Sequence, residues 1–186
     1  MVEFVKCNVC GYVIKQSQVK DVCPACGAKS SAFKPYESKV SEKRMKILDF
    51  NIHPLLVHFP GGLIPFIFIL SILVAVFNDP LRLNLFIALK VLTVVLPFVV
   101  LITVLAGAFD ANVRYKTLKT PMIKQKLIVG TTILLISIVP AVLIFFIDYN
   151  TLEILWIIGL AFLLLIGVLL QGLVGPKLAK AIRVGK

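Results

Sequence analysis

Four cysteines near the N-terminus are the residues best suited by type and spacing to carry chemistry. They form two C-x-x-C pairs, Cys7 with Cys10 and Cys23 with Cys26, and the chain contains no others. A two-residue spacer lets both thiolates of a pair face one metal ion, and two such pairs complete a tetrahedral four-sulfur site. A glycine follows each pair and permits a tight turn there. The spacing therefore predicts a metal centre, and four thiolates suit zinc and iron alike.

The residues around these pairs resemble the short rubredoxin module of rubrerythrins. The matching string comprises Phe4, Cys7-x-x-Cys10-Gly11-Tyr12, Cys23-Pro24-x-Cys26-Gly27-Ala28 and Phe33. The resemblance covers residues 2–36 and implies one iron ion in the four-cysteine site and one-electron transfer. The segment between the pairs is shorter than in free-standing rubredoxins, and the alternative is a zinc ribbon that only holds the module together. In either case so small a module needs its metal to fold.

The chain has two histidines, His53 and His58, at the start of a long apolar stretch. Ionisable residues in membrane segments are rare and are functional candidates by default. Helix positions five apart differ by roughly 140° in direction and about 7.5 Å in height. The two axial ligands of a haem iron face each other about 4 Å apart, so one helix cannot supply both. We therefore expect a haem-b-like cofactor held by His53 and His58 at a homodimer interface.

Other roles for the histidines stay open. They also suit a quinone headgroup, a non-haem metal or a haem with one open face. As structural residues, His53 would cap the helix and His58 would hydrogen-bond within the bundle. The opening string His53-Pro54-Leu55-Leu56-Val57-His58-Phe59-Pro60 resembles an uncharacterised family of small four-helix bacterial and archaeal membrane proteins. That resemblance covers roughly residues 50–175 and implies a membrane domain without naming an activity.

The rest of the chain supplies the elements that position these groups. The 186 residues are 59% hydrophobic and 16% charged, with a mean hydropathy of +0.99. Soluble domains are about 45–50% apolar and about 25% charged, so an ordinary soluble enzyme is excluded. Disorder is excluded as well. Four apolar stretches, 52–77, 83–108, 123–147 and 153–175, each exceed the ~20 residues that a spanning helix needs.

These stretches predict an all-α membrane domain, a four-transmembrane-helix bundle with a small N-terminal rubredoxin-like metal-binding domain. The expected organisation is an iron domain at 1–37, a charged tether at 38–51, the membrane domain at 52–175 and a basic tail at 176–186.

The net charge is +11, from 20 Lys and Arg against 9 Asp and Glu, and the distribution of the basic residues indicates how the chain is oriented in the membrane. Basic residues gather before the first span, in the second connection and in the tail, whereas the first and third connections hold few. By the positive-inside rule, both termini and the middle connection face the cytoplasm of a multi-pass protein in the cell (inner or plasma) membrane. A basic–aromatic pattern typical of nucleic-acid binding is absent from the sequence.

This topology brings polar residues and glycines of all four spans to the level of the histidines. They are Gly61, Gly62, Gly107, Asp110, Lys124, Gln125, Lys126, Gln171, Gly172 and Gly175. The glycines would let a flat ring or a neighbouring helix approach closely. Arg114, Lys124 or Lys126 would pair with haem propionates or snorkel to the membrane surface.

These observations favour a membrane-bound electron carrier. Electrons would pass from a cytoplasmic donor such as a rubredoxin reductase, through the iron site, to the cofactor at the histidines, and then to a quinone or an oxygen species. The alternatives are a zinc docking module on a non-redox anchor or channel, and an oxidoreductase that turns over at an open haem position. The sequence contains no recognisable set of catalytic side chains, so any enzymatic chemistry would belong to the cofactors.

Overall fold

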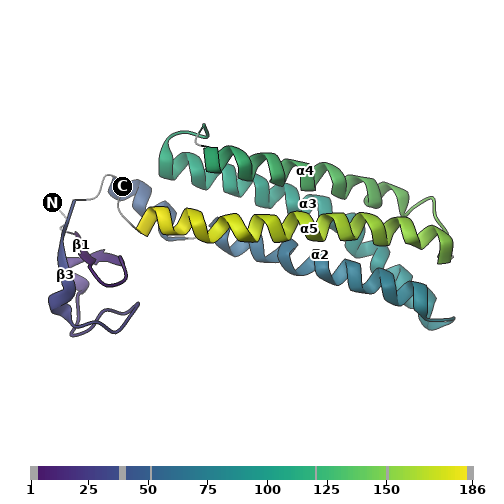
Figure 1. Ribbon diagram of the computed structural model, residues 1–186, viewed down its shortest axis with the longest axis horizontal. Coiled ribbons are helices and arrows are strands. Elements are labelled where there is room, and N and C mark those ends of the chain that lie inside the picture. Colours follow the sequence, from purple (N-terminus) through teal and green to yellow (C-terminus); the bar gives the residue numbers. More distant parts are fainter. Residues whose placement is uncertain (1–3, 38–40, 51, 120, 150, 184–186) are drawn as a thin grey trace. The chain divides into compact units, whose positions relative to one another are not determined.

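The computed structural model describes residues 4–37, 41–50, 52–119, 121–149 and 151–183, so part of the expected tether and of the basic tail lies outside the described residues. The chain divides into two compact units: Met1–Lys46 with Gly175–Lys186, and Ile47–Val174. The elements in chain order (Figure 1) are β1 (Phe4–Cys7), β2 (Val13–Lys15), η1 (Gln16–Gln18), η2 (Ser30–Ala32), β3 (Phe33–Tyr36), α1 (Glu42–Asp49), α2 (Ile52–Val76), α3 (Leu81–Tyr115), α4 (Pro121–Leu143) and α5 (Thr151–Arg183).

The N-terminal unit is built on a three-stranded antiparallel sheet with the order β2-β1-β3. In β1 burial alternates along the strand, so Val5 and Cys7 face inward while their neighbours are half-buried. Val5, Cys7 and Cys23 are the buried apolar residues among those described in this unit. A core of one aliphatic side chain and two sulfurs is too small to hold a fold of this length, which points to a bound metal.

The second unit contains four helices that are long and apolar enough to cross a membrane: Ile52–Val76, Leu81–Arg114, Pro121–Leu143 and Leu152–Leu173. Between 22% and 33% of their most apolar windows is buried inside the structure. The remaining apolar side chains face outward, which is favourable in the hydrocarbon of a bilayer and would be unfavourable in water. The predicted fold class is therefore confirmed, and the chain is a multi-pass membrane protein.

The four helices share one apolar core. On α2 the buried residues Ile64, Ile67, Leu70 and Val74 recur at spacings of three and four, which is one face of a helix. α3 packs against both α2 and α4. The other core residues are Phe86, Leu89, Leu96 and Val100 of α3, Ile133 of α4, Ile144, and Ile154, Ile157, Ala161 and Leu164 of α5.

Three helix ends differ clearly from the predicted spans, and one of them is the end of α5, which continues past 175 to Arg183 within the predicted basic tail. α3 continues past 108 to Tyr115 because its polar last turns keep the helical spacing, and Asp110 pairs with Arg114 one turn on. α4 ends at Leu143, short of 147. There the backbone tightens: the N–H of Phe145 bonds the Val142 carbonyl at 3.2 Å, and the N–H of Phe146 bonds the Leu143 carbonyl at 2.9 Å.

Candidate metal centre and histidine sites

The two C-x-x-C pairs lie in two turns of the same construction. In the first turn, the Cys7 N–H donates to the Tyr12 carbonyl at 2.8 Å and the Gly11 N–H donates to the Cys7 carbonyl at 2.8 Å. The second turn repeats both bonds, from Cys23 to Ala28 at 2.7 Å and from Gly27 to Cys23 at 2.8 Å. The repeated motif explains why the same sequence pattern occurs twice.

The glycine after each pair is required by the backbone. Gly11 has φ 76° and Gly27 has φ 72°, in the left-handed region that side-chain-bearing residues adopt at a cost of roughly 1–2 kcal/mol. A β-carbon added at Gly27 would meet no atom within 4 Å, so the requirement there is conformational rather than steric. Each glycine lets its turn fold back beside the sulfurs.

The four sulfur atoms surround one point. All four Sγ atoms lie within 4.8 Å of one another. The Sγ atoms of Cys7 and Cys26 are 3.9 Å apart, and those of Cys10 and Cys23 are 3.7 Å apart. A tetrahedral metal with bonds of about 2.3 Å to sulfur needs sulfurs about 3.8 Å apart. The observed distances fit a four-thiolate metal centre, and the N-terminal unit is a metal-binding module.

The cysteines differ in exposure and in acidity. Cys7 and Cys23 are buried, Cys10 is half-buried and Cys26 is exposed. A backbone hydrogen bond from Cys10 is the main influence that lowers the pKa of the Cys7 thiol to about 7. The Ala28 backbone N–H lowers the pKa of Cys26, but desolvation and the three neighbouring sulfurs outweigh it and raise that pKa to about 12. Four negative charges do not collect here without a cation to neutralise them.

His53 is half-buried and lies against the backbone of α3. A β-carbon added to Gly107 would stand 2.8 Å from His53 Cε1 and 3.0 Å from Nδ1, closer than real side chains come. Gly107 therefore admits a flat ring, as the sequence suggests, and the ring is the imidazole of the same chain. His53 Nδ1 is buried and makes no hydrogen bond of good geometry among the described residues, although the backbone of Thr103 in α3 is close enough to interact with the ring.

Polar side chains of α3 and α4 lie near this imidazole, and a side chain of α5 joins the same part of α4. Asp110 of α3 and Lys126 of α4 both interact electrostatically with His53 and with each other. Gln171 of α5 donates from Nε2 to the Lys126 carbonyl at 2.9 Å. We call His53, Asp110, Lys126 and Gln171 the polar cluster. Of the polar residues that the topology predicts at this level, the structure brings these together, whereas Lys124 and Gln125 are exposed.

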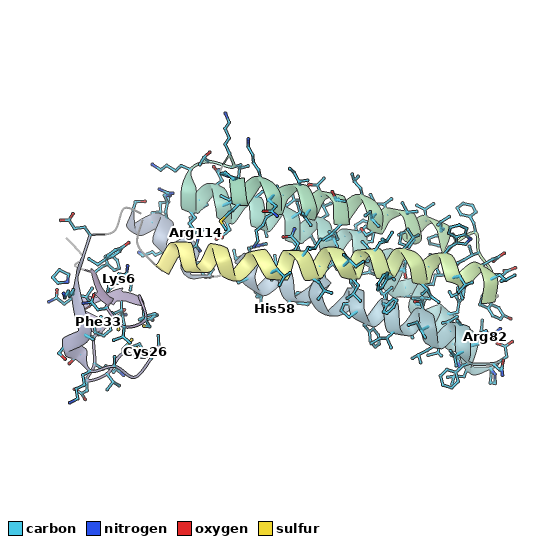
Figure 2. All side chains as sticks on the ribbon, in the orientation of Figure 1. Lys6, Cys26, Phe33, His58, Arg82 and Arg114 are labelled. Atoms are coloured by element: carbon cyan, nitrogen blue, oxygen red, sulfur yellow. The ribbon has the colours of Figure 1, made fainter. Side chains whose placement is uncertain are left out.

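His58 has different surroundings (Figure 2). Its side chain is exposed on α2, whereas that of His53 is directed toward α3. Gly61 and Gly62 lie one turn further along α2, and no atom lies within 4 Å of a methyl group added at either. The two histidines therefore do not converge within one chain, as positions five apart on a helix require.

The remaining residues that the sequence predicts near the histidines are likewise either packed against neighbours or exposed. Gly172 also has open space beside it, and Lys124 is exposed. Arg114 lies 3.7 Å from Asp110. Sequence reasoning missed Gly130, where an added β-carbon would lie 3.5 Å from Gln171 Nε2. Its spacing of four from Lys126 was the available signal, because it places both residues on one face of α4.

Fold and sites together define a class: a multi-pass membrane protein with four spanning helices and an N-terminal four-cysteine metal-binding module. Comparison with protein families assigns both parts. The rubrerythrin, rubredoxin-like domain matches residues 6–34. The family described as predicted membrane protein (DUF2231) matches residues 49–186, and the chain belongs to that family. Searches of curated proteins and of solved structures found no match.

Proposed function

We propose that this protein is a membrane-bound one-electron carrier whose cysteine module holds iron. It receives electrons from a cytoplasmic donor such as a rubredoxin reductase and passes them to a haem-b-like cofactor at the membrane histidines. The final acceptor is a quinone or an oxygen species. If the protein turns over as an oxidoreductase, that chemistry belongs to the cofactors.

The observation that carries the proposal is the four-sulfur cluster with a buried and an outward-lying cysteine in each turn. Iron bound by four thiolates supplies a one-electron couple. Cys7 and Cys23 anchor the cluster in the interior, and the exposed Cys26 extends the ligand set to the surface of the module. A partner protein can therefore approach the cluster closely. The match to a rubredoxin-like domain supports iron over zinc.

The orientation of the protein follows from its charges. The positive-inside rule places both termini, and with them the cysteine module, on the cytoplasmic side of the cell membrane. His53 and His58 lie in the first turns of α2, on the same side by this assignment. The proposed donor and acceptor cofactors thus share one membrane face.

Of the two histidines, His58 is the better candidate for a haem ligand. Its exposed imidazole and the open space at Gly61 and Gly62 would admit a flat macrocycle beside α2. A second copy of the chain, related by a two-fold axis, would present its own His58 as the opposite ligand. An exposed imidazole at the edge of the bilayer also favours a protein partner over lipid, because polar groups facing hydrocarbon are costly.

A visible spectrum and an elemental analysis of the purified full-length protein test this function. We expect about one non-haem iron per chain in addition to the haem iron, together with thiolate-to-iron charge-transfer bands and a haem Soret band. The His58→Ala variant loses half or all of its haem but keeps its non-haem iron, and the Cys10→Ser variant loses the non-haem iron but keeps its haem. Zinc in the cysteine site together with no Soret band would refute the proposal and favour a docking module on a non-redox anchor.

A further inference from the structure

The four ligands of the metal centre differ in how far they are shielded from solvent. Cys7 and Cys23 are buried, Cys10 is half-buried and Cys26 is exposed. The two turns repeat the same backbone hydrogen bonds, so the difference between Cys10 and Cys26 does not come from the turns themselves. It comes from what surrounds the second cysteine of each pair.

The surroundings of the two turns are unequal. The Asn8 N–H donates to the Ala32 carbonyl at 2.9 Å, and this bond ties the first turn to the rest of the N-terminal unit. The second turn has an open tip, because residues 24–27 are all exposed and a methyl group added at Gly27 would meet no atom within 4 Å. A small solute can therefore reach the Cys26 sulfur directly from water.

A second sulfur lies close enough to complete an oxidation that begins at Cys26. The Sγ atom of Cys7 is 3.9 Å away, and all four Sγ atoms lie within 4.8 Å of one another. A disulfide bond is about 2.05 Å long, so an approach of roughly 2 Å would close one. Metal binding removes the proton from each cysteine and leaves the nucleophilic thiolate. Redox-sensitive cysteines are typically accessible thiolates beside a resolving cysteine, and Cys26 meets these conditions.

We propose that Cys26 is a hydroperoxide-sensitive site whose oxidation removes two ligands from the metal and unfolds the N-terminal unit. The unfolding follows from the small core, in which Val5 is the buried aliphatic residue among those described. A module with so little apolar burial depends on its metal. This inference goes beyond the proposed function, since a zinc centre would respond as an iron centre does.

The oxidation proceeds in two steps that balance with hydrogen peroxide as the oxidant. In the first, the Cys26 thiolate attacks one peroxide oxygen, so an S–O bond forms, the O–O bond breaks and hydroxide leaves. In the second, a neighbouring thiolate attacks the Cys26 sulfur, so an S–S bond forms, the S–O bond breaks and a second hydroxide leaves. The two sulfurs together lose two electrons, which reduce the peroxide. Two cysteines then remain as thiolates, too few to complete a four-sulfur site.

The test follows metal and thiols together in the full-length, metal-loaded protein in detergent. The sample is first oxidised in air, so that any bound iron is ferric, and is then treated with hydrogen peroxide. A colour-forming chelator measures released metal, a thiol reagent counts the remaining thiols, and dimedone with peptide mass spectrometry locates the first sulfenic acid. We expect one metal ion released for every two thiols lost, the first dimedone adduct on Cys26, and recovery of bound metal after reduction with dithiothreitol and resupply of the metal. Samples without peroxide control for removal of metal by the chelator.

Two matched variants keep every ligand and change the shielding of one outer cysteine each. Ala25→Leu enlarges the exposed side chain next to Cys26, and Val9→Leu does the same next to Cys10. We expect peroxide-driven metal release to slow at least threefold in the first variant and to stay unchanged in the second, because Cys10 is not the sulfur attacked first.

Each outcome bears on the proposal. Equal slowing in both variants, a first adduct on another cysteine, or loss of thiols without release of metal would overturn it. Limited proteolysis of the N-terminal unit should increase in step with metal release, and an unchanged proteolytic pattern after release would refute the unfolding step. Elemental analysis of the untreated samples reports separately on the proposed function, since a peroxide-resistant iron centre would overturn this inference alone.

Discussion

Substituting Gly107 by alanine tests whether His53 truly lies against α3. The new β-carbon would stand 2.8 Å from His53 Cε1, whereas ordinary contact begins at 3.4 Å. The imidazole would therefore have to move by about 0.6 Å in a close-packed interior. The ring is rigid, and its own Cβ is fixed to α2, so it cannot yield as the end of a long side chain does.

The expected magnitude follows from two opposing terms. Overpacking of this kind costs roughly 1–3 kcal/mol, and replacing a helical glycine by alanine returns about 0.5–1 kcal/mol. The central values leave a net loss of about 1 kcal/mol, which corresponds to a fall in Tm of roughly 2–4 °C for a chain of this size. The assay is thermal unfolding of the purified protein in detergent, followed by circular dichroism.

Two matched variants make the test specific. Gly62→Ala meets no atom within 4 Å, so its Tm should stay level or rise. Gly167→Ala meets Cγ1 of Ile133 at 2.9 Å and Cδ1 at 3.1 Å; because Ile133 is β-branched and only 6% exposed, this variant should lower the Tm as Gly107→Ala does and serves as the positive control. Equal Tm values for Gly107→Ala and Gly62→Ala would show that His53 does not occupy this position and would remove the basis for the polar cluster.

Three further predictions concern the metal module and the bundle. Gly27→Ala should weaken metal retention about 5–30-fold in a chelator competition assay, because alanine pays roughly 1–2 kcal/mol at this φ; an unchanged half-time for metal loss would contradict this. Metal affinity should fall as pH falls from 8 to 6. The thiol of Cys7, with a pKa of about 7, regains its proton over this range, and the thiol of Cys26, with a pKa of about 12, must release a proton to bind the metal at either pH. Competition titrations at the two pH values should differ, and equal affinities would refute the reasoning. Gln171→Ala should lower stability by about 0.6–1.7 kcal/mol through loss of its bond to the Lys126 carbonyl, which thermal unfolding measures against the wild-type protein, and an unchanged Tm would argue against that bond.

Local rules explain what could be predicted from the sequence. The cysteine turns depend on residues close together in the chain, and the pattern Cys-x-x-Cys-Gly states both the ligands and the positive φ that follows them. The four spans depend only on apolar length, which the bilayer fixes. Both features were therefore visible without any knowledge of packing.

Tertiary contacts explain what could not be predicted. That His53 and His58 face different ways follows from helical spacing, but which of them is directed inward depends on Gly107, which lies 54 positions away in the chain. The end of α4 at Leu143 depends on local backbone geometry that hydrophobicity does not encode. The link from Gln171 across Gly130 to Lys126 joins two helices whose relative rotation no pattern within either one specifies.

The scarcity of aliphatic side chains inside the N-terminal unit has a consequence for the protein in the cell. With Val5 as the buried aliphatic residue among those described there, the unit holds its shape through its sulfurs and whatever they ligate. The membrane helices have their own core and do not share this dependence. Newly synthesised chains that bind no metal should therefore insert into the membrane normally but carry an unfolded, protease-sensitive N-terminal unit. A limited supply of the metal would then reduce the number of folded N-terminal units while leaving the number of inserted membrane units unchanged.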